Sequence, residues 1–346
     1  MNTKNRRSNL TKPVRKSKGK EVSPISEGAK LVDQYFDHVG EAFLRHAPEI
    51  DPEKLKDWRP KLFSFTRLNP WYGGLVGVHR KRIGVGKDKL VWLEIGQENS
   101  PALLLMHGFA AAKEHWLPLL PFFAGQFRIL IPDLPGWGES GFNPDRNYGL
   151  EDQTERLHDW LTEIGVHKVN VVGNSMGGAL AGLLAARFPE MVTSLVLMDA
   201  LGLPGTEETD FIREVLRGKN RLVPRAPMDV IKLTDLVFHN RALAASAAFF
   251  SATELIHRRD VNSFLFQEML SRRPDYTKAT FEDISAPTLV MWGKQDDVLH
   301  ISCAYEFERL IKRAEMCLFD GVGHLPMIET PYPCAQAIKE FVLRNL

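Results

Sequence analysis

Residues 169–178 read VNVVGNSMGG, a short β-branched run that ends in a Gly-x-Ser-x-Gly motif. A helical pattern over residues 179–188 follows directly, so Ser175 falls on a tight turn between a strand and a helix. Such a turn strains the serine backbone, and the positions two residues before and after it must lack side chains so that strand and helix can approach. Gly173 and Gly177 occupy those positions. The stretch predicts a nucleophile elbow, with Ser175 at a helix N-terminus where the dipole favours a developing anion.

A glycine-rich turn after a strand can also hold a nucleotide phosphate. The dinucleotide-binding fingerprint GxGxxG does not match here, because Gly173, Ser175 and Gly178 stand at its three glycine positions. We therefore favour a nucleophile over a phosphate site.

From residue 89 onwards, runs rich in Leu, Val and Ile alternate with helical patterns. This rhythm is typical of an α/β fold with a mainly parallel central sheet flanked by helices. The expected strands cover residues 90–95, 102–106, 127–132, 168–173, 193–198, 287–292 and 316–319. The expected helices cover residues 114–124, 152–164, 176–188, 302–311 and 333–343.

Residues 201–284 break this rhythm, since they carry helical patterns but no convincing strand. We expect an inserted helical cap, or lid, over 201–284 and a core formed by residues 89–200 and 285–346. Within the cap, the Ala-rich stretch 242–252 carries Phe249 and Phe250. We expect this helix to pack inside the cap; a lipid-facing surface is the alternative.

The N-terminal region divides in two. Residues 28–88 begin with apolar residues at steps of three and four between positions 28 and 47, which predicts a helical extension. Residues 1–27 are polar and cannot form a core, so we expect a disordered basic tail. The chain has 44 Lys and Arg against 43 Asp and Glu, yet its first 20 residues hold eight basic residues and no acid. The net charge of +1 is therefore a tail of +8 joined to a body of −7.

Composition and cysteine usage indicate a globular protein of a reducing compartment. Hydrophobic residues make up 44% of the chain, no run of about 18 apolar residues predicts a membrane span, and no apolar stretch follows the basic start as in a signal peptide. The three cysteines, Cys303, Cys317 and Cys334, lack the spacing of a metal site, so we read them as free thiols. We expect a cytoplasmic location, no metal and no specific nucleic-acid partner. The sequence does not indicate the oligomeric state.

A second predicted strand end carries the signature of an oxyanion hole. The expected strand 102–106 runs into His107, Gly108 and Phe109. In this arrangement the loop supplies one backbone N–H and the residue after the nucleophile supplies the other, which assigns the N–H groups of Phe109 and Met176. We expect His107 and Gly108, like Gly173 and Gly177, to support the site structurally.

The acid and the base are expected after two later strands, in the order serine, acid, histidine. Asp296 follows the strand 287–292 and His324 follows the strand 316–319. Since the carboxyl ends of parallel strands share one edge of a sheet, Asp296 can orient His324, which takes the Ser175 proton and passes it to the leaving group.

Two other carboxylates compete with Asp296 as the acid. They are Asp297, its neighbour, and Asp199, at the end of the strand 193–198. The remaining histidines that fall in helical or cap patterns are expected at the surface or in packing: His115, His257 and His300.

From residue 90 to the C-terminus the chain resembles the α/β-hydrolase superfamily, in the segments HGF, DLPGWGES, GNSMGG, WGKQDDV and GHLPMIETP. The segment DLPGWGES is expected to form a structural loop near the pocket mouth. LMHGFAAAKEHWL, GNSMGGALAG and TLVMWGKQDDVLHISCA are similar to the monoacylglycerol lipase branch of the α/β-hydrolase-domain proteins and to related bacterial lipases. The resemblance implies a triad of Ser175, Asp296 and His324.

Members of that branch hydrolyse esters of glycerol and fatty acids beneath a helical cap. The resemblance therefore implies a serine hydrolase that needs no cofactor and acts on monoacylglycerols or short acyl glycerol esters. Two alternatives share the fold: hydrolysis of a C–C bond in a ring-cleavage product, and a ligand-binding protein without catalysis. Dehalogenase and epoxide hydrolase chemistry is excluded, because those enzymes use Asp at the elbow where this chain has Ser175.

The basic tail has two interpretations. Lys and Arg near an anionic membrane contribute about 1 kcal/mol each to binding, which predicts peripheral contact between the tail and a membrane that contains lipid esters. The alternative is a solvated tail without function.

Overall fold

The computed structural model describes residues 27–59, 77–86, 88–123, 125–272 and 280–346. The expected basic tail, residues 1–27, lies outside the described residues apart from Glu27. None of the helices within the described ranges is both long enough and apolar enough to cross a membrane.

The described residues form one eight-stranded sheet with the order β1-β2-β4-β3-β5-β6-β7-β8. The pairs β1–β2 and β2–β4 are antiparallel and the remaining pairs are parallel. This arrangement confirms the predicted α/β fold with a mainly parallel sheet. The strands are β1 (His79–Val85), β2 (Asp88–Ile95), β3 (Ala102–Met106), β4 (Arg128–Asp133), β5 (Val169–Asn174), β6 (Val192–Met198), β7 (Thr288–Gly293) and β8 (Ala314–Phe319).

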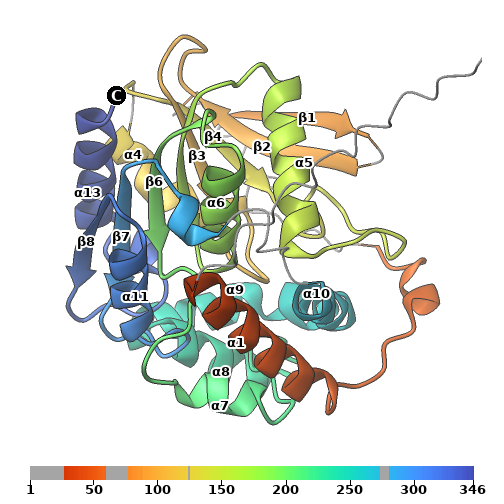
Figure 1. Cartoon of the computed structure of the whole chain (residues 1–346). Helices are drawn as coiled ribbons and strands as arrows, with labels where there is room; N and C mark the ends of the chain where they lie inside the picture. Colours follow the sequence, from red (N-terminus) through yellow and green to blue (C-terminus); the bar gives the residue numbers. More distant parts are fainter. Residues whose placement is uncertain (1–26, 60–76, 87, 124, 273–279) are drawn as a thin grey trace, which may run out of the picture.

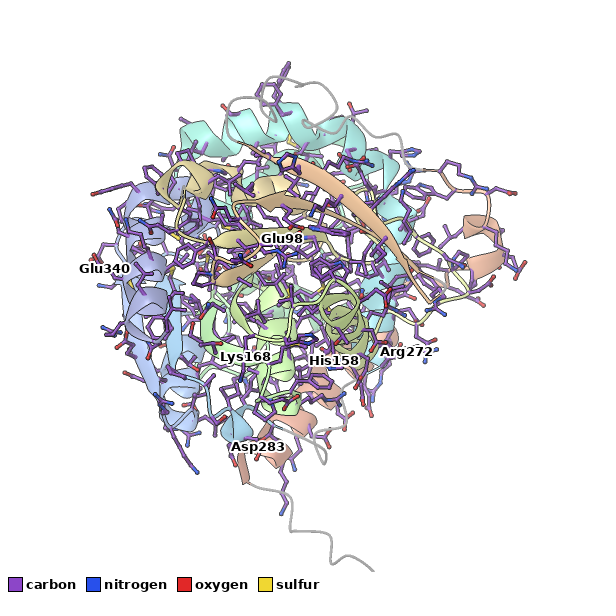
Figure 2. The ribbon with its side chains drawn as sticks, turned by 90° about the horizontal axis from the view of Figure 1, so that it is seen from above. Glu98, His158, Lys168, Arg272, Asp283 and Glu340 are labelled. Atoms are coloured by element: carbon purple, nitrogen blue, oxygen red, sulfur yellow. The ribbon has the colours of Figure 1, made fainter. Side chains whose placement is uncertain are left out.

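Helices cover both faces of the sheet (Figure 1). One face packs against α5 (Leu150–Glu163), α6 (Met176–Arg187) and α11 (Ser302–Leu310). The other packs against η2 (Lys113–Leu119), α4 (Leu120–Phe123) and α13 (Pro331–Arg344). Figure 2 shows the two helical layers from above, with His158 on α5 and Glu340 on α13. Two apolar clusters, one on each face, therefore bury the parallel strands from both sides.

The strand registers bring the functional loops to one edge of the sheet. Met106 at the end of β3 pairs with Gly173, and Asn174 at the end of β5 pairs with Met198. Met198 pairs in turn with Met291, and Gly293 at the end of β7 pairs with Phe319 at the end of β8. The loops after β3, β5, β6, β7 and β8 consequently start side by side.

Two local expectations need correction. Residues 79–85, which we expected within a helical extension covering 28–88, form the edge strand β1. The sequence of β1 lacks the apolar run that predicts a buried strand, because an edge strand can carry exposed basic side chains. The expected helix 114–124 is instead the 3₁₀ segment η2 followed by the single turn α4, because Pro118 cannot donate a backbone hydrogen bond inside an α-helix.

Between β6 and β7 the described chain is helical, in the region where we expected a cap. It contains α7 (Asp210–Val215), α8 (Pro227–Val237), α9 (Arg241–His257), α10 (Arg259–Ser271) and the short η3 (Phe281–Asp283). The N-terminal helix α1 (Glu27–Leu44) lies against these helices in Figure 1. Its buried Phe43 packs edge-on against Phe266 of α10, with ring centroids 5.0 Å apart.

The expected internal packing of the Ala-rich helix is wrong for its two phenylalanines. Phe249 is 81% exposed and Phe250 is 72% exposed. The helix α9 buries Ala248 and Leu255 against Val230 and Leu233 of α8, and the two α9 positions share one face at helical spacing. Residues 249 and 250 project from other faces of α9 and therefore remain outside this apolar contact.

Candidate active site

Ser175 lies between β5 and α6 in a backbone conformation that L-residues rarely adopt, with φ 56° and ψ −120°. The glycines on either side make this turn sterically allowed. A Cβ atom on Gly173 would lie 2.1 Å from the Gly177 carbonyl oxygen, and a Cβ atom on Gly177 would lie 2.4 Å from the Met106 carbonyl oxygen. Backbone cannot move aside as a flexible side chain can, so both positions require glycine. The tight turn presents Ser175 at the N-terminus of α6.

His324 and Asp296 meet in a buried hydrogen bond. The His324 Nδ1 atom lies 2.7 Å from Asp296 Oδ2, although 28 residues separate them in the chain. The other carboxylate oxygen, Oδ1, accepts the N–H groups of Val298 at 2.7 Å and Leu299 at 3.0 Å. Both carboxylate oxygens of Asp296 therefore have a donor, and the bond to Oδ2 makes Nδ1 the hydrogen-bonded nitrogen of His324. The Nε2 atom is then the one available as a base.

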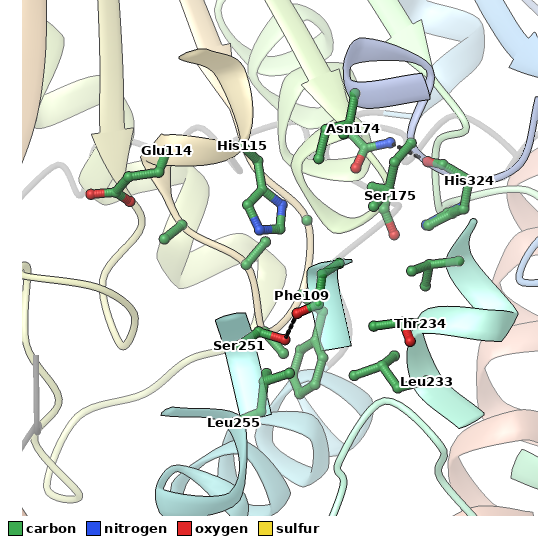
Figure 3. Close-up of a pocket in the computed structure, with 18 of the residues that line it drawn as sticks. Phe109, Glu114, His115, Asn174, Ser175, Leu233, Thr234, Ser251, Leu255 and His324 are labelled. Atoms are coloured by element: carbon green, nitrogen blue, oxygen red, sulfur yellow. Dashed lines mark hydrogen bonds between the residues drawn. The ribbon is translucent and has the colours of Figure 1, made fainter. Parts of the chain in front are cut away.

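Asn174, which the sequence analysis did not single out, holds the histidine loop in place. Its side-chain Nδ2 donates to the His324 carbonyl oxygen at 3.1 Å (Figure 3). The same Nδ2 donates to the Met198 carbonyl oxygen at 3.3 Å. The His324 N–H donates to the carbonyl oxygen of Val237 in α8 at 3.0 Å. Asn174 stands inside the glycine-serine motif, but a partner 150 residues away leaves no local signal in the sequence.

Ser175 and His324 line the same cavity, together with the loop after β3. Among the hydrogen bonds of the described residues, none joins the Ser175 hydroxyl to the His324 ring. Catalytic hydrogen bonds are often long or poorly aligned before substrate binds and become shorter in the complex, so this geometry is compatible with a serine–histidine pair.

The competing residues do not make the hydrogen bond to His324 Nδ1, although Asp199 lies within 4.8 Å of that histidine. Asp297 is exposed, whereas Asp296 is buried. Asp199 is fully buried, and its Oδ1 accepts the Gly293 N–H at 2.9 Å. His257 stacks on Trp58, and His300 contacts Ser302. His115, which we expected at the surface or in packing, is partly buried and lines the cavity, and burial lowers its pKa.

The loop after β3 brings the expected oxyanion donors beside Ser175. A Cβ atom on Gly108 would approach the Ser175 Cβ to 3.0 Å, so Gly108 permits this contact. Within the described chain, no backbone hydrogen bond in turns and loops uses the N–H groups of Phe109 and Met176. Two such N–H groups flanking a serine at a helix N-terminus can stabilise a negatively charged oxygen.

His107 fixes this loop as a neutral side chain. Its Nε2 accepts the Leu134 N–H at 3.0 Å, so the ring proton resides on Nδ1, which lies 2.8 Å from the Gly108 carbonyl oxygen. Burial lowers the pKa of His107 to about 3, which keeps it uncharged at neutral pH. His107 thus ties the loop after β3 to the loop after β4.

A buried charge network, formed by Lys113, Asp133 and Glu139, joins the same two loops. The Lys113 Nζ atom lies 2.7 Å from Asp133 Oδ2 and 3.1 Å from Glu139 Oε2. The Asp133 carboxylate also accepts the N–H groups of Lys113 and Glu139. Burial alone would lower the pKa of Lys113, but the charge of Asp133 and then that of Glu114 raise it above its ordinary value. Lys113 is therefore a charged residue that joins the loop after β3 to the DLPGWGES segment, since Asp133 and Glu139 both belong to that segment.

The cavity that Ser175 and His324 line has a volume of 490 Å³, and its walls are mostly apolar. Figure 3 shows Ser175 and His324 on one wall, with Leu233 and Thr234 of α8 and Leu255 of α9 across from them. A second, smaller cavity of 80 Å³ also reaches Ser175 and Phe109, and α1 and α10 contribute to its apolar lining. Two apolar spaces therefore meet at the serine.

One cluster of His, Cys, Asp and Glu side chains in the described residues has the spacing of a metal site. It consists of Asp199, Asp296 and His324, with ligand atoms within 4.8 Å of one another. The Nδ1 atom of His324 is already hydrogen bonded to Asp296, so this geometry is that of an oriented histidine.

Comparison with known proteins identifies relatives over most of the chain. The family model described as alpha/beta hydrolase fold matches residues 101–331. The chain is 29% identical to Lipase 1 of Psychrobacter immobilis, over 73% of this chain and 80% of that protein. It is 28% identical to Monoacylglycerol lipase ABHD6 of Homo sapiens, over 70% of this chain and 76% of that protein. The crystal structure of a membrane phospholipase A, a bacterial virulence factor, superposes with a TM-score of 0.76 and 32% identity, covering 85% of this chain and 93% of that one.

Replacing Lys113 with Met tests the buried charge network. Because the change leaves the buried carboxylates of Asp133 and Glu139 without their shared cation, we expect the free energy of unfolding to fall by about 3 to 5 kcal/mol. Chemical denaturation followed by far-UV circular dichroism measures this loss. The matched control is Lys56→Met, which removes an exposed ion pair with Glu53 and should change stability little. Equal small effects of the two substitutions would show that the network does not hold the loops together.

Proposed function

Given that the chain belongs to the alpha/beta hydrolase fold family, we propose that it is a serine hydrolase that cleaves carboxylic esters of lipids. The observation that carries the proposal is the convergence of a strained serine, a histidine oriented by Asp296 and the loop after β3 on one apolar cavity. We propose Ser175, His324 and Asp296 as the catalytic residues, with the N–H groups of Phe109 and Met176 as the oxyanion hole.

The reaction proceeds in two steps through an acyl-enzyme. The Ser175 Oγ attacks the ester carbonyl carbon while its proton passes to His324 Nε2. The bond to the alcohol oxygen then breaks, and His324 returns the proton to the departing alcohol. Water, deprotonated by His324, attacks the acyl-enzyme; the fatty acid leaves and Ser175 regains its proton. In both steps the oxyanion receives hydrogen bonds from the Phe109 and Met176 N–H groups.

The substrate class follows from the cavity and the relatives. Apolar walls and a volume of 490 Å³ suit an acyl chain, since ligand pockets of this kind measure about 300 to 1,000 Å³. The second cavity beyond Ser175 offers space for the other arm of an ester. Relatives named as lipase and monoacylglycerol lipase support an acyl glycerol, and we propose monoacylglycerols or short acyl glycerol esters as substrates. The helices α8 and α9, which belong to the expected cap 201–284, line the cavity and then act as its cap.

A substrate panel tests this proposal against the C–C hydrolase alternative. We expect measurable hydrolysis of monoacylglycerols and p-nitrophenyl esters of varied chain length, and none of a ring-cleavage dienoate. The control is Ser175→Ala, which should reduce ester hydrolysis by at least about 10³-fold while circular dichroism and the melting temperature remain those of the parent protein. A preference for the dienoate, or full esterase activity in the alanine variant, would contradict the proposal.

We also propose that the basic tail draws the enzyme to anionic membranes. This proposal rests on the sequence of the first 20 residues, which contain eight Lys and Arg residues and no acid. These residues lie outside the described ranges. The exposed Phe249 and Phe250 on α9 support contact with a membrane, because Phe250 also lines the cavity that contains Ser175. A membrane so contacted would present lipid esters close to Ser175.

Deleting residues 1–20 tests the role of the tail. In low salt we expect weaker binding to vesicles that contain phosphatidylglycerol and unchanged binding to neutral phosphatidylcholine vesicles, as measured by co-sedimentation. Hydrolysis of a soluble p-nitrophenyl ester should be the same with and without the tail. Undiminished binding of the shortened chain to anionic vesicles would assign no membrane role to these residues.

A further inference from the structure

Asp199 is a buried carboxyl group that the proposed reaction does not use. It follows β6 directly, it is 0% exposed, and its backbone has a φ of 44°, which is uncommon for a residue other than glycine. Its N–H donates to the Met291 carbonyl oxygen, and its Oδ1 accepts the Gly293 N–H, both at 2.9 Å. Two hydrogen bonds thus attach Asp199 to the strand that leads to Asp296. Its Oδ2 atom is buried, and no donor group among the described residues is hydrogen bonded to it.

The neighbour of this carboxyl group is the proposed catalytic acid. Side-chain atoms of Asp199, Asp296 and His324 all lie within 4.8 Å of one another. Two carboxylates at this separation in a buried site repel each other, and one of them keeps its proton when no cation lies between them.

The hydrogen-bond donors around the pair decide which carboxyl group keeps the proton. Asp296 accepts two backbone N–H groups and faces the ring N–H of His324. Asp199 accepts a single backbone N–H. Burial first, and then the charge of Asp296, raise the pKa of Asp199 well above its ordinary value. Asp199 is therefore the member of the pair that keeps the proton.

The other titratable groups around Asp199 do not supply a cation. Cys334 of α13 is fully buried, and burial raises the pKa of its thiol well above the ordinary value, so it is neutral. Glu329 of α12 (Pro326–Glu329) accepts the N–H groups of Gly323 and Asn240 and adds negative charge. Asp296 and His324 are the remaining groups that face it. The neutral thiol of Cys334 and the negative charge of Glu329 thus favour a protonated Asp199.

We propose that Asp199 is a positioning residue whose protonated carboxyl group donates a hydrogen bond to Asp296 and thereby lowers the basicity of His324. This inference rests on the proposed function, because it assigns His324 as the base and Asp296 as its partner. A donor to Asp296 withdraws negative charge from the oxygen that holds the His324 ring, so the imidazolium form is stabilised less. His324 then stays neutral, and able to accept the serine proton, to a lower pH.

Two substitutions at Asp199 separate this role from the others. Asp199→Asn keeps an N–H donor and a carbonyl acceptor, and Asn tolerates a positive φ. Asp199→Ala removes both groups. We measure kcat/KM for a soluble p-nitrophenyl ester against pH, and the acid limb of that profile reports the pKa of the base in the free enzyme.

The expected result is an unchanged acid limb in Asp199→Asn and a limb displaced by about 0.5 to 1 pH unit to higher pH in Asp199→Ala. If Asp199 were ionised, both variants would lose a negative charge beside His324, and both limbs would move to lower pH. If Asp199 only supported the fold, the limb would stay in place in both variants while stability fell. Either of these results overturns the proposal.

An infrared measurement decides the protonation state even if Asp199→Ala fails to fold. The difference spectrum between the parent protein and Asp199→Asn at neutral pH should contain the C=O stretch of a protonated carboxylic acid, which is absent from the variant. A carboxylate band in its place overturns the proposal. This readout needs no turnover, so it remains decisive if the protein hydrolyses no ester, an outcome that would contradict the proposed function instead.

Discussion

The close approach of α6 to the ends of β3 and β5 is the constraint on which the site depends. Ser175 can adopt its positive φ only because the strand and the helix come together at Gly173 and Gly177, where a single Cβ atom would collide with backbone. This contact aims the serine away from the sheet and turns the first N–H groups of α6 toward the cavity. Backbone geometry therefore creates both the nucleophile's exposure and half of the proposed oxyanion hole.

The second requirement is that loops far apart in the chain stay in register with this turn. Parallel pairing brings the ends of β3, β5, β6, β7 and β8 to one edge, and buried polar groups then lock the loops together. His107 and Lys113 join the loops after β3 and β4, Asn174 joins the elbow to the histidine loop, and Asp199 joins β6 to the end of β7. Each of these residues is buried and none is a proposed catalytic group. Their hydrogen bonds and ion pairs hold the loops that carry the reacting groups in one geometry.

The sequence was most informative where buried periodicity and strand-end motifs coincide. Seven strands were predicted within two residues of their observed bounds, because parallel strands covered on both faces are almost continuously apolar. The edge strand β1 escaped prediction, since its exposed face carries Arg and Lys. Phe249 and Phe250 were misassigned because composition alone cannot tell which face of a helix meets a neighbour. The proposed catalytic residues follow strand ends in recognisable motifs. The roles of Asn174 and Lys113 depend on partners 150 and 20 residues away, which no local pattern reveals.

The central claim is that Ser175 is an activated nucleophile, and labelling with a fluorophosphonate probe tests it most directly. A fluorophosphonate forms a covalent bond only with a serine whose hydroxyl is deprotonated by a neighbouring base and whose adduct is held by oxyanion donors. Intact-protein mass spectrometry should find one adduct per chain, peptide mapping should place it on Ser175, and His324→Ala should abolish it in a folded protein. An unmodified chain, or an adduct on another residue, would contradict the account.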